Sequence, residues 1–339
     1  MRTAVVICPG RGTYGAAELG YLARHHAGAG EIAAFDAIRA AAGQETVSAL
    51  DGAERFSTAK HTRGDAASPL IYACSLLDAL SLTGVEVVAV TGNSMGWYTA
   101  LAAAGAVTPT AGFEIANTMG TLMQAHMIGG QLVYPFLGDD WRPDPARKAA
   151  LLEIVAGIGA RAGHVLGLSI DLGGMLVLAG NAEGLAAFEA AVPRVDRFPM
   201  RLANHAGFHT ELQAPVAAEG QSRLGVELFG GPRRPLIDGR GHIWWPHATD
   251  PAQLRAYTLG HQVTEPYDFT RAIATAAREF APDLFIVTGP GTTMGGAVAQ
   301  SLVLAGWQGL ACREDVRAAS AAAPFIVSMG DPGQRALLG

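Results

Sequence analysis

Residues 85–104, with the sequence VEVVAVTGNSMGWYTALAAA, decide the fold of this chain. The first half is a run of β-branched apolar residues, which predicts a buried strand, and the second half is an alanine-rich run, which predicts a packed helix. Between them lies Gly92-x-Ser94-x-Gly96, and the order of strand, G-x-S-x-G and helix is the one that a nucleophile elbow requires. There a serine lies on a sharp turn, small neighbours make room for it, and the helix N-terminus supplies N–H groups to an oxyanion. The alternative is an ordinary βα turn whose glycines serve only packing, because G-x-S-x-G is common by chance.

The composition is that of a folded, enzyme-like chain. Of its 339 residues 50% are hydrophobic and only 16% are charged, which excludes a disordered chain. The net charge of −6, without any block of basic residues, argues against nucleic acid as a partner. A chain of this length predicts either one large domain with an insertion or two domains.

The cysteines indicate the redox compartment. Cys8, Cys74 and Cys312 form an odd, sparse set without paired spacing, which indicates reduced thiols and predicts a cytoplasmic protein. The apolar run at residues 4–8 is too short for a signal peptide. Longer apolar runs are interrupted by glycine, proline or charge, so we expect no membrane-spanning segment.

A glycine-rich loop follows the first predicted strand. Residues 9–15 read PGRGTYG, so Gly10, Gly12 and Gly15 match G-x-G-x-x-G, and a dinucleotide-dependent oxidoreductase has to be considered. The next segment, 31–42, has helical spacing and is not a second strand that ends in an acidic residue. The alternative is a loop whose backbone N–H groups face a neighbouring site.

Residues 129–203 differ in character from the rest of the chain. Their pattern predicts helices over 146–162 and 184–192 and strands over 165–171, 175–179 and 195–203. This βαββαβ-like succession predicts a small inserted α/β sandwich. We therefore expect a large domain of residues 1–128 and 204–339 and an insertion of residues 129–203. The role of the alanine-rich tail after residue 313 stays open.

A nucleophilic serine needs a base, and two histidines follow the insertion. His205 and His209 have the H-x-x-x-H spacing, which binds zinc on a helix with Glu after the first histidine. Here Ala206 follows instead, and Gly207 breaks a helix, so we expect no metal site.

Five motifs lie in order along the chain: PGRG at 9–12, GNSMGWYTA at 92–100, FHT at 208–210, QVTEP at 262–266 and GPG at 289–291. In this order and spacing they resemble the motifs of one known family, the malonyl-CoA:acyl carrier protein transacylases, and of the related acyltransferase domains of polyketide synthases. They span the chain from Cys8 to about Leu302. The resemblance implies an α/β fold, with an α/β-hydrolase-like core around a parallel sheet and an inserted ferredoxin-like small subdomain.

The resemblance also implies the roles of individual residues. Ser94 would be the nucleophile and His209 its base, oriented by the main-chain carbonyl of Gln262 without a triad carboxylate. The backbone N–H groups of Arg11 and Met95 would form the oxyanion hole. Because the backbone does this work, we expect the side chain of Arg11 to point away from the site. The alternative is that it swings in and binds a carboxylate, as a malonyl group would require.

The chain departs from the family pattern at four positions. Asn93 replaces the histidine before the serine, Trp97 replaces an acidic residue, and Ser68 stands where glutamine is frequent. At Met119 the family has an arginine that pairs bidentately with the malonyl carboxylate. We expect Met119 and Phe208 to line an acyl pocket, and we predict an uncharged, unbranched acyl group, with malonyl as the alternative.

The function implied is transfer of an acyl group from acyl-CoA through a Ser94 ester to the phosphopantetheine thiol of an acyl carrier protein. No permanently bound cofactor is expected. A hydrolase that lets water take the acyl group and a non-catalytic family member are the rivals. Carrier proteins are generally acidic, so a local basic patch is expected, and the candidates are Arg142, Arg147, Lys148, Arg161, Arg194, Arg197 and Arg201.

Overall fold

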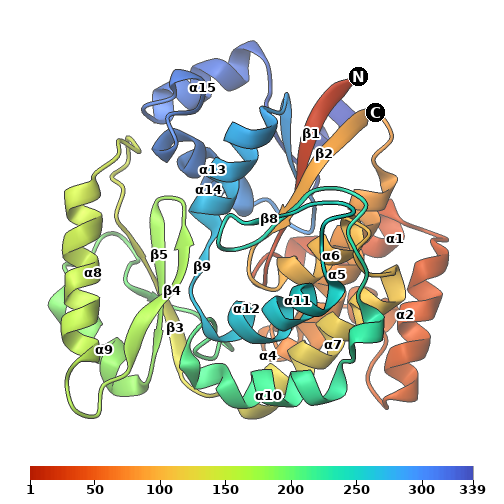
Figure 1. The fold of residues 1–339 in the computed structure, drawn as a ribbon, viewed down its shortest axis with the longest axis horizontal. Helices are drawn as coiled ribbons and strands as arrows, with labels where there is room; N and C mark the ends of the chain where they lie inside the picture. Colours follow the sequence, from red (N-terminus) through yellow and green to blue (C-terminus); the bar gives the residue numbers. More distant parts are fainter. Residues whose placement is uncertain (339) are drawn as a thin grey trace.

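The computed structural model describes residues 1–338 as a mixed α/β molecule with two lobes (Figure 1). The strands are β1 Arg2–Cys8, β2 Val85–Gly92, β3 Gly130–Pro135, β4 Leu166–Leu172, β5 Met175–Gly180, β6 Met200–Arg201, β7 Leu236–Ile237, β8 Ile243–Trp244, β9 Tyr267–Asp268, β10 Leu284–Val287 and β11 Ile326–Ser328. The first eight helices are α1 Tyr21–His25, α2 Gly30–Ala41, α3 Val47–Asp51, α4 Thr58–His61, α5 Gly64–Ser81, α6 Gly96–Ala103, α7 Pro109–His126 and α8 Pro145–Gly159. The others are α9 Ala182–Ala191, α10 Ala214–Arg223, α11 Pro251–Ala256, α12 Gln262–Thr264, α13 Phe269–Phe280, α14 Met294–Leu304, α15 Arg313–Ala322 and α16 Pro332–Arg335.

The larger sheet has six strands in the order β11-β10-β1-β2-β7-β8. All neighbours are parallel except the edge pair β7 and β8. Strands β1 and β10 are almost fully buried, as expected for a parallel sheet whose faces are covered by helices. The α/β class with a parallel sheet, expected from the sequence, is confirmed.

The C-terminal tail, whose role the sequence leaves open, completes this sheet. After α15 the chain forms β11, which pairs in parallel with β10. Arg335 in α16 then donates to the fully buried carboxylate of Asp78, which also accepts from His26 and Tyr21. The tail is therefore part of the folded core.

The second sheet has five strands in the order β6-β3-β5-β4-β9, and α8 and α9 pack beside it in the left lobe of Figure 1. Its first four strands and two helices follow one another as β-α-β-β-α-β. The fifth strand, β9, comes from beyond residue 203 and pairs in parallel with β4. The division of the chain at residues 129 and 203 stays a prediction.

The strand predicted over 195–203 is much shorter in the structure. Only Met200–Arg201 forms a strand, because Val195 and Phe198 pair with each other in a tight turn and Pro199 has no N–H to donate. The alternation of side chains in this segment thus reflects a turn that enters the sheet at its edge.

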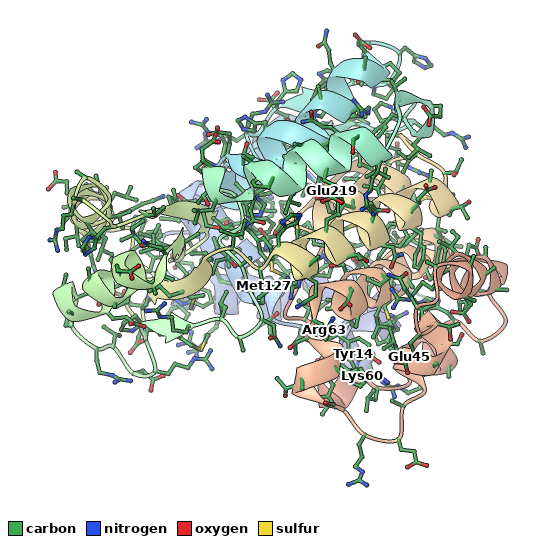
Figure 2. The ribbon with its side chains drawn as sticks, turned by 90° about the horizontal axis from the view of Figure 1, so that it is seen from below. Tyr14, Glu45, Lys60, Arg63, Met127 and Glu219 are labelled. Atoms are coloured by element: carbon green, nitrogen blue, oxygen red, sulfur yellow. The ribbon has the colours of Figure 1, made fainter. Side chains whose placement is uncertain are left out.

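The two lobes meet where α7 ends. Figure 2 shows Met127 at that end and Glu219 of α10 beside α7. Glu219 Oε2 lies 3.0 Å from His126 Nε2. Met127 adopts a left-handed conformation, with φ of 40°, which ends the helix before β3 begins.

Among residues 1–338, no helix combines the length and apolar character needed to cross a membrane. All three cysteines are free and buried.

Candidate active site

The G-x-S-x-G segment forms a sharp turn between β2 and α6. Ser94 has φ of 56°, in the left-handed region that favours glycine, so its backbone is strained. A Cβ on Gly92 would lie 2.3 Å from the carbonyl oxygen of Gly96, and a Cβ on Gly96 would lie 2.1 Å from that of Cys8. Only glycine fits at either position, which is the packing that an elbow requires.

Ser94 and His209 lie in hydrogen-bond contact, although 115 positions separate them in the chain. The distance from Ser94 Oγ to His209 Nε2 is 2.8 Å, and His209 Nδ1 lies 2.7 Å from the carbonyl oxygen of Gln262. The carbonyl can only accept, so Nδ1 carries the proton and Nε2 is left to accept that of the serine. Burial lowers the pKa of His209 to about 4, against a smaller opposing effect of the hydrogen bond to Gln262, so the imidazole is neutral at pH 7.

The side chain of Gln262 connects the two residues further, which sequence reasoning missed. Its Nε2 donates to the carbonyl oxygen of Ser94 at 3.0 Å, and its Oε1 accepts from the hydroxyl of Tyr98 at 3.2 Å. Tyr98 comes four residues after Ser94, on the first turn of α6, and this spacing was the available signal that it faces the site. Gln262 follows a π-helical turn, Tyr257–His261, of a kind often found at functional sites.

The N-terminal glycine-rich loop packs directly against the elbow. A Cβ on Gly10 would lie 2.6 Å from the carbonyl oxygen of Asn93. The backbone N–H groups of Arg11 and Met95 donate to no other group within residues 1–338. Met95 is the N-cap of α6, where the helix dipole favours negative charge. Two free N–H donors are therefore available beside the nucleophile.

The side chain of Arg11 does not point away from the site, contrary to expectation. Its Nη2 donates to the carbonyl oxygens of Thr62 and Asn204, both at 2.7 Å, and its guanidinium lies 5.4 Å from the centre of the Phe208 ring. Nε and Nη1 have no acceptor in the part of the chain that the structure describes, and no carboxylate there forms an ion pair with Arg11. Burial lowers the pKa of Arg11 to about 10, which still leaves it charged at neutral pH.

Two cavities meet at Ser94, and Arg11 and Phe208 line both. The large cavity has a volume of about 370 Å³ and opens between the second sheet and α14. The small cavity has a volume of about 20 Å³ and lies on the side of His209. The small cavity is lined by Arg11, Ser68, Ser94, Met95, Tyr98, Gly120, Met123, Phe208, His209, Gln262 and Val263.

Met119 lines neither cavity, which corrects its expected place in the acyl pocket. It is fully buried, and a Cβ on Gly220 of α10 would lie 2.6 Å from its sulfur. Helix α7 is oriented so that Gly120 and Met123, three residues apart, face the small cavity instead. Met119 therefore packs α7 against α10.

The other three departures from the family pattern have different environments. Trp97 is fully buried and donates to Thr258 at 3.0 Å, so it serves packing. Ser68 lies on α5 in the wall of the small cavity. Asn93 lies in the wall of the large cavity, next to the nucleophile.

Comparison with solved structures identifies the fold. The chain aligns with the malonyl-CoA:acyl carrier protein transacylase (FabD) of Xanthomonas oryzae at a TM-score of 0.75, with 20% identity over 99% of this chain and 97% of that one. It aligns with the MCAT of Mycobacterium tuberculosis at a TM-score of 0.74, with 22% identity over 99% of both chains.

This chain has the malonyl-CoA:acyl carrier protein transacylase fold. A third structure with that fold is a complex of a type II polyketide synthase acyl carrier protein with its malonyl-transacylase, which aligns at a TM-score of 0.73 with 18% identity over 100% of this chain and 99% of that one. No protein-family model matches the chain, and no curated protein does. The transacylase fold was thus recognisable from five short motifs at an identity of about one residue in five.

Proposed function

We propose that the protein is an acyltransferase that moves an acyl group from acyl-CoA to the phosphopantetheine thiol of an acyl carrier protein. The observation that carries this is the hydrogen-bonded series from Ser94 Oγ to His209 Nε2 and from His209 Nδ1 to the Gln262 carbonyl. A nucleophile, a base and a group that orients the base are what acyl transfer through a serine ester needs.

In the first half-reaction His209 Nε2 takes the proton of Ser94 as Oγ attacks the thioester carbonyl. The negative charge that develops on the carbonyl oxygen is stabilised by the N–H groups of Arg11 and Met95. The C–S bond then breaks, His209 returns the proton to the leaving thiolate, and the acyl group remains on Ser94. In the second half-reaction the carrier's thiol repeats the sequence in reverse, which gives ping-pong kinetics.

The acyl group that we propose is short, and Arg11 favours one with a carboxylate. The prediction of an uncharged group depended on Met119, which lines neither cavity. Arg11 does line both, and it is a partly buried cation that forms no ion pair among residues 1–338, although the charge of Asp65 partly offsets the effect of burial on its pKa. A buried cation gains most from a ligand of opposite charge, so a malonyl-type group is the first candidate and acetyl the second.

For the carrier protein we propose a docking surface at the mouth of the large cavity. Four of the seven basic candidates are held within the protein: Arg142 by Asp140, Lys148 by Asp171, Arg201 by Glu189 and Arg147 by the carbonyl of Pro135. Arg161, Arg194 and Arg197 form no ion pair with the described residues, and Arg197 lines the cavity. Charge reversal at Arg194 and Arg197 should raise KM for the carrier but not for acyl-CoA, and equal effects on both would argue against this surface.

Intact-protein mass spectrometry tests the proposal. The protein is incubated with an equimolar mixture of acetyl-, butyryl-, hexanoyl- and malonyl-CoA, with and without carrier protein. We expect a malonyl adduct on Ser94 in at least tenfold excess, and its transfer when carrier is added. An excess of the acetyl adduct would support the original prediction of an uncharged acyl group. Loss of the adduct to water at the same rate with and without carrier would favour the hydrolase. Absence of any adduct would favour the non-catalytic protein.

A further inference from the structure

The residue that carries the base has a strained backbone. His209 has φ of 57°, in the left-handed region that residues other than glycine rarely adopt. A strained conformation persists only where surrounding contacts hold it, and such residues are frequent at functional sites. The contacts that hold the backbone of His209 therefore determine how its imidazole approaches Ser94.

The peptide group between Phe208 and His209 is held from both lobes. Its N–H, which belongs to His209, donates to the carbonyl oxygen of Val263 in α12 at 3.1 Å. Its carbonyl oxygen, which belongs to Phe208, accepts from Ser169 Oγ of β4 at 2.8 Å and from no other group within residues 1–338. Because a peptide group is planar, these two contacts together fix the backbone from which the imidazole extends.

The side chain of Ser169 is directed by an irregularity in β4. Leu168 and Ile170, which are two positions apart in β4, pair with consecutive residues of β5. Ser169 between them is therefore the extra residue of a β-bulge. Bulges redirect side chains and are common next to active sites. The contact between Ser169 and the segment that carries the base thus depends on a local feature of the second sheet.

Gln131 of β3 determines which way the Ser169 hydroxyl donates. Both side chains are buried, and Gln131 Nε2 lies 2.7 Å from Ser169 Oγ. An amide nitrogen can only donate, so the single proton of the hydroxyl is left for the carbonyl of Phe208. The opposite orientation of the carboxamide would take that proton and leave the buried carbonyl without a donor, which is unfavourable.

We propose that Ser169 is a positioning residue for His209, through which the second sheet holds the base in line with Ser94. This rests on the proposed function, which makes His209 the base. The segment is then fixed by three contacts: the Gln262 carbonyl on Nδ1, the Val263 carbonyl on the backbone N–H, and Ser169 on the preceding carbonyl. Two of these contacts come from α12 and one from the second lobe, so both lobes align the base.

The rate at which a fluorophosphonate labels Ser94 tests this proposal, because the reagent needs an activated serine but no acyl group or carrier protein. Ser169→Ala should slow labelling about tenfold or more, since a ~1 Å displacement of a catalytic group costs about 100-fold. Ser169→Thr keeps the hydroxyl and should retain most of the wild-type rate. Should Ser169→Ala fail to fold, Ser169→Cys offers the same comparison with a much weaker donor.

Ser301→Ala is the matched control. Ser301 in α14 is equally buried and also donates to a backbone carbonyl at 2.8 Å, that of Ala297, but it lines neither cavity. Its replacement should lower the denaturant midpoint without slowing the labelling of Ser94. Equal labelling rates in Ser169→Ala and Ser301→Ala would overturn the proposal, and so would a Ser169→Thr variant as slow as Ser169→Ala.

Failure of the proposed function would give a different result. In that case acyl-CoA forms no adduct with the wild-type protein, whatever the effect of Ser169. Nitrogen-15 NMR of the His209 ring then tests the positioning by itself. The tautomer with the proton on Nδ1 should predominate in the wild type and in Ser301→Ala and should lose population in Ser169→Ala. An unchanged tautomer in Ser169→Ala would overturn the proposal.

Discussion

The two cavities that meet at Ser94 differ in size and in the elements that form them. The small cavity, of about 20 Å³, is enclosed by side chains of α5, α6, α7 and α12. The large cavity, of about 370 Å³, lies between the second sheet, α14 and the N-terminal loop. A volume of ~15 Å³ or more holds one water and ~300 Å³ or more is typical of a ligand site, so the acyl group and the pantetheine arm face different constraints. In the small cavity, we therefore expect one side chain, such as Met123, to determine which acyl group fits.

Acylation and transfer both require Ser94 and His209, whichever cavity holds the acyl group. Ser94→Ala should abolish the covalent adduct, and His209→Ala should lower turnover by ~10³-fold or more, because the two residues act as one unit. Adduct formation by mass spectrometry and steady-state transfer to carrier measure these effects. Full activity of Ser94→Ala would contradict the mechanism for both cavities.

Replacement of Arg11 tests the charge of the small cavity. Arg11→Met keeps the length and the backbone N–H but removes the cation, so malonyl-CoA should lose about tenfold or more against acetyl-CoA in competition for Ser94. Arg194→Met, which removes a cation outside both linings, is the matched control and should leave the ratio unchanged. If Arg11→Met leaves the ratio of malonyl to acetyl adduct unchanged, Arg11 does not recognise a carboxylate and the prediction of an uncharged acyl group stands.

Two methionines on α7 have different roles: Met123 lines the small cavity, and Met119 packs α7 against α10. Met123→Ala should enlarge the cavity and raise kcat/KM for butyryl-CoA relative to acetyl-CoA by about tenfold, the scale of one or two methylene groups. Met119→Ala should leave that ratio unchanged and lower the free energy of unfolding by about 2–5 kcal/mol, since Met119 is fully buried. Denaturant unfolding and competition assays distinguish the two, and the reverse pattern would place Met119 in the pocket after all.

The pH dependence should be the smallest effect. His209 is active when neutral, and burial lowers its pKa from 6.5 to about 4, so acylation of Ser94 should change less than about twofold between pH 8 and pH 5.5. Below that, the rate should fall as His209 takes up a proton. The free energy of unfolding should also fall with pH. His209 binds a proton below pH 6.5 in the unfolded chain but only near pH 4 in the folded one, so its contribution to stability is lost as the pH falls between these values. A limb of the rate profile near pH 6.5 would mean a solvated His209.

Local pattern was sufficient for the elbow. Its strand, its serine and its two glycines lie within twelve residues. Glycine is required at position 92 by a contact inside the turn, with the carbonyl of Gly96, but at position 96 by the carbonyl of Cys8 in β1. Helices α2, α8 and α9 and strands β4 and β5 followed from periodicity in the same way. The segment 195–203 did not, because alternation of side chains cannot distinguish a strand from a turn that contains a proline.

The residues alone therefore determined the α/β class, the elbow and, through five motifs, the transacylase fold. Only the tertiary structure decided which side chains surround Ser94. It brought His209 and Gln262 to the serine across 115 and 168 positions, aimed Met123 rather than Met119 at the site, and drew Arg11 over Phe208. It also placed β9 beside β4 in the second sheet, although the strands before and after it in the chain, β8 and β10, belong to the larger sheet. The physical reason is that backbone propensity and hydrophobic period act over a few residues, whereas the rotation of a helix or the partner of an edge strand is set by packing between distant segments.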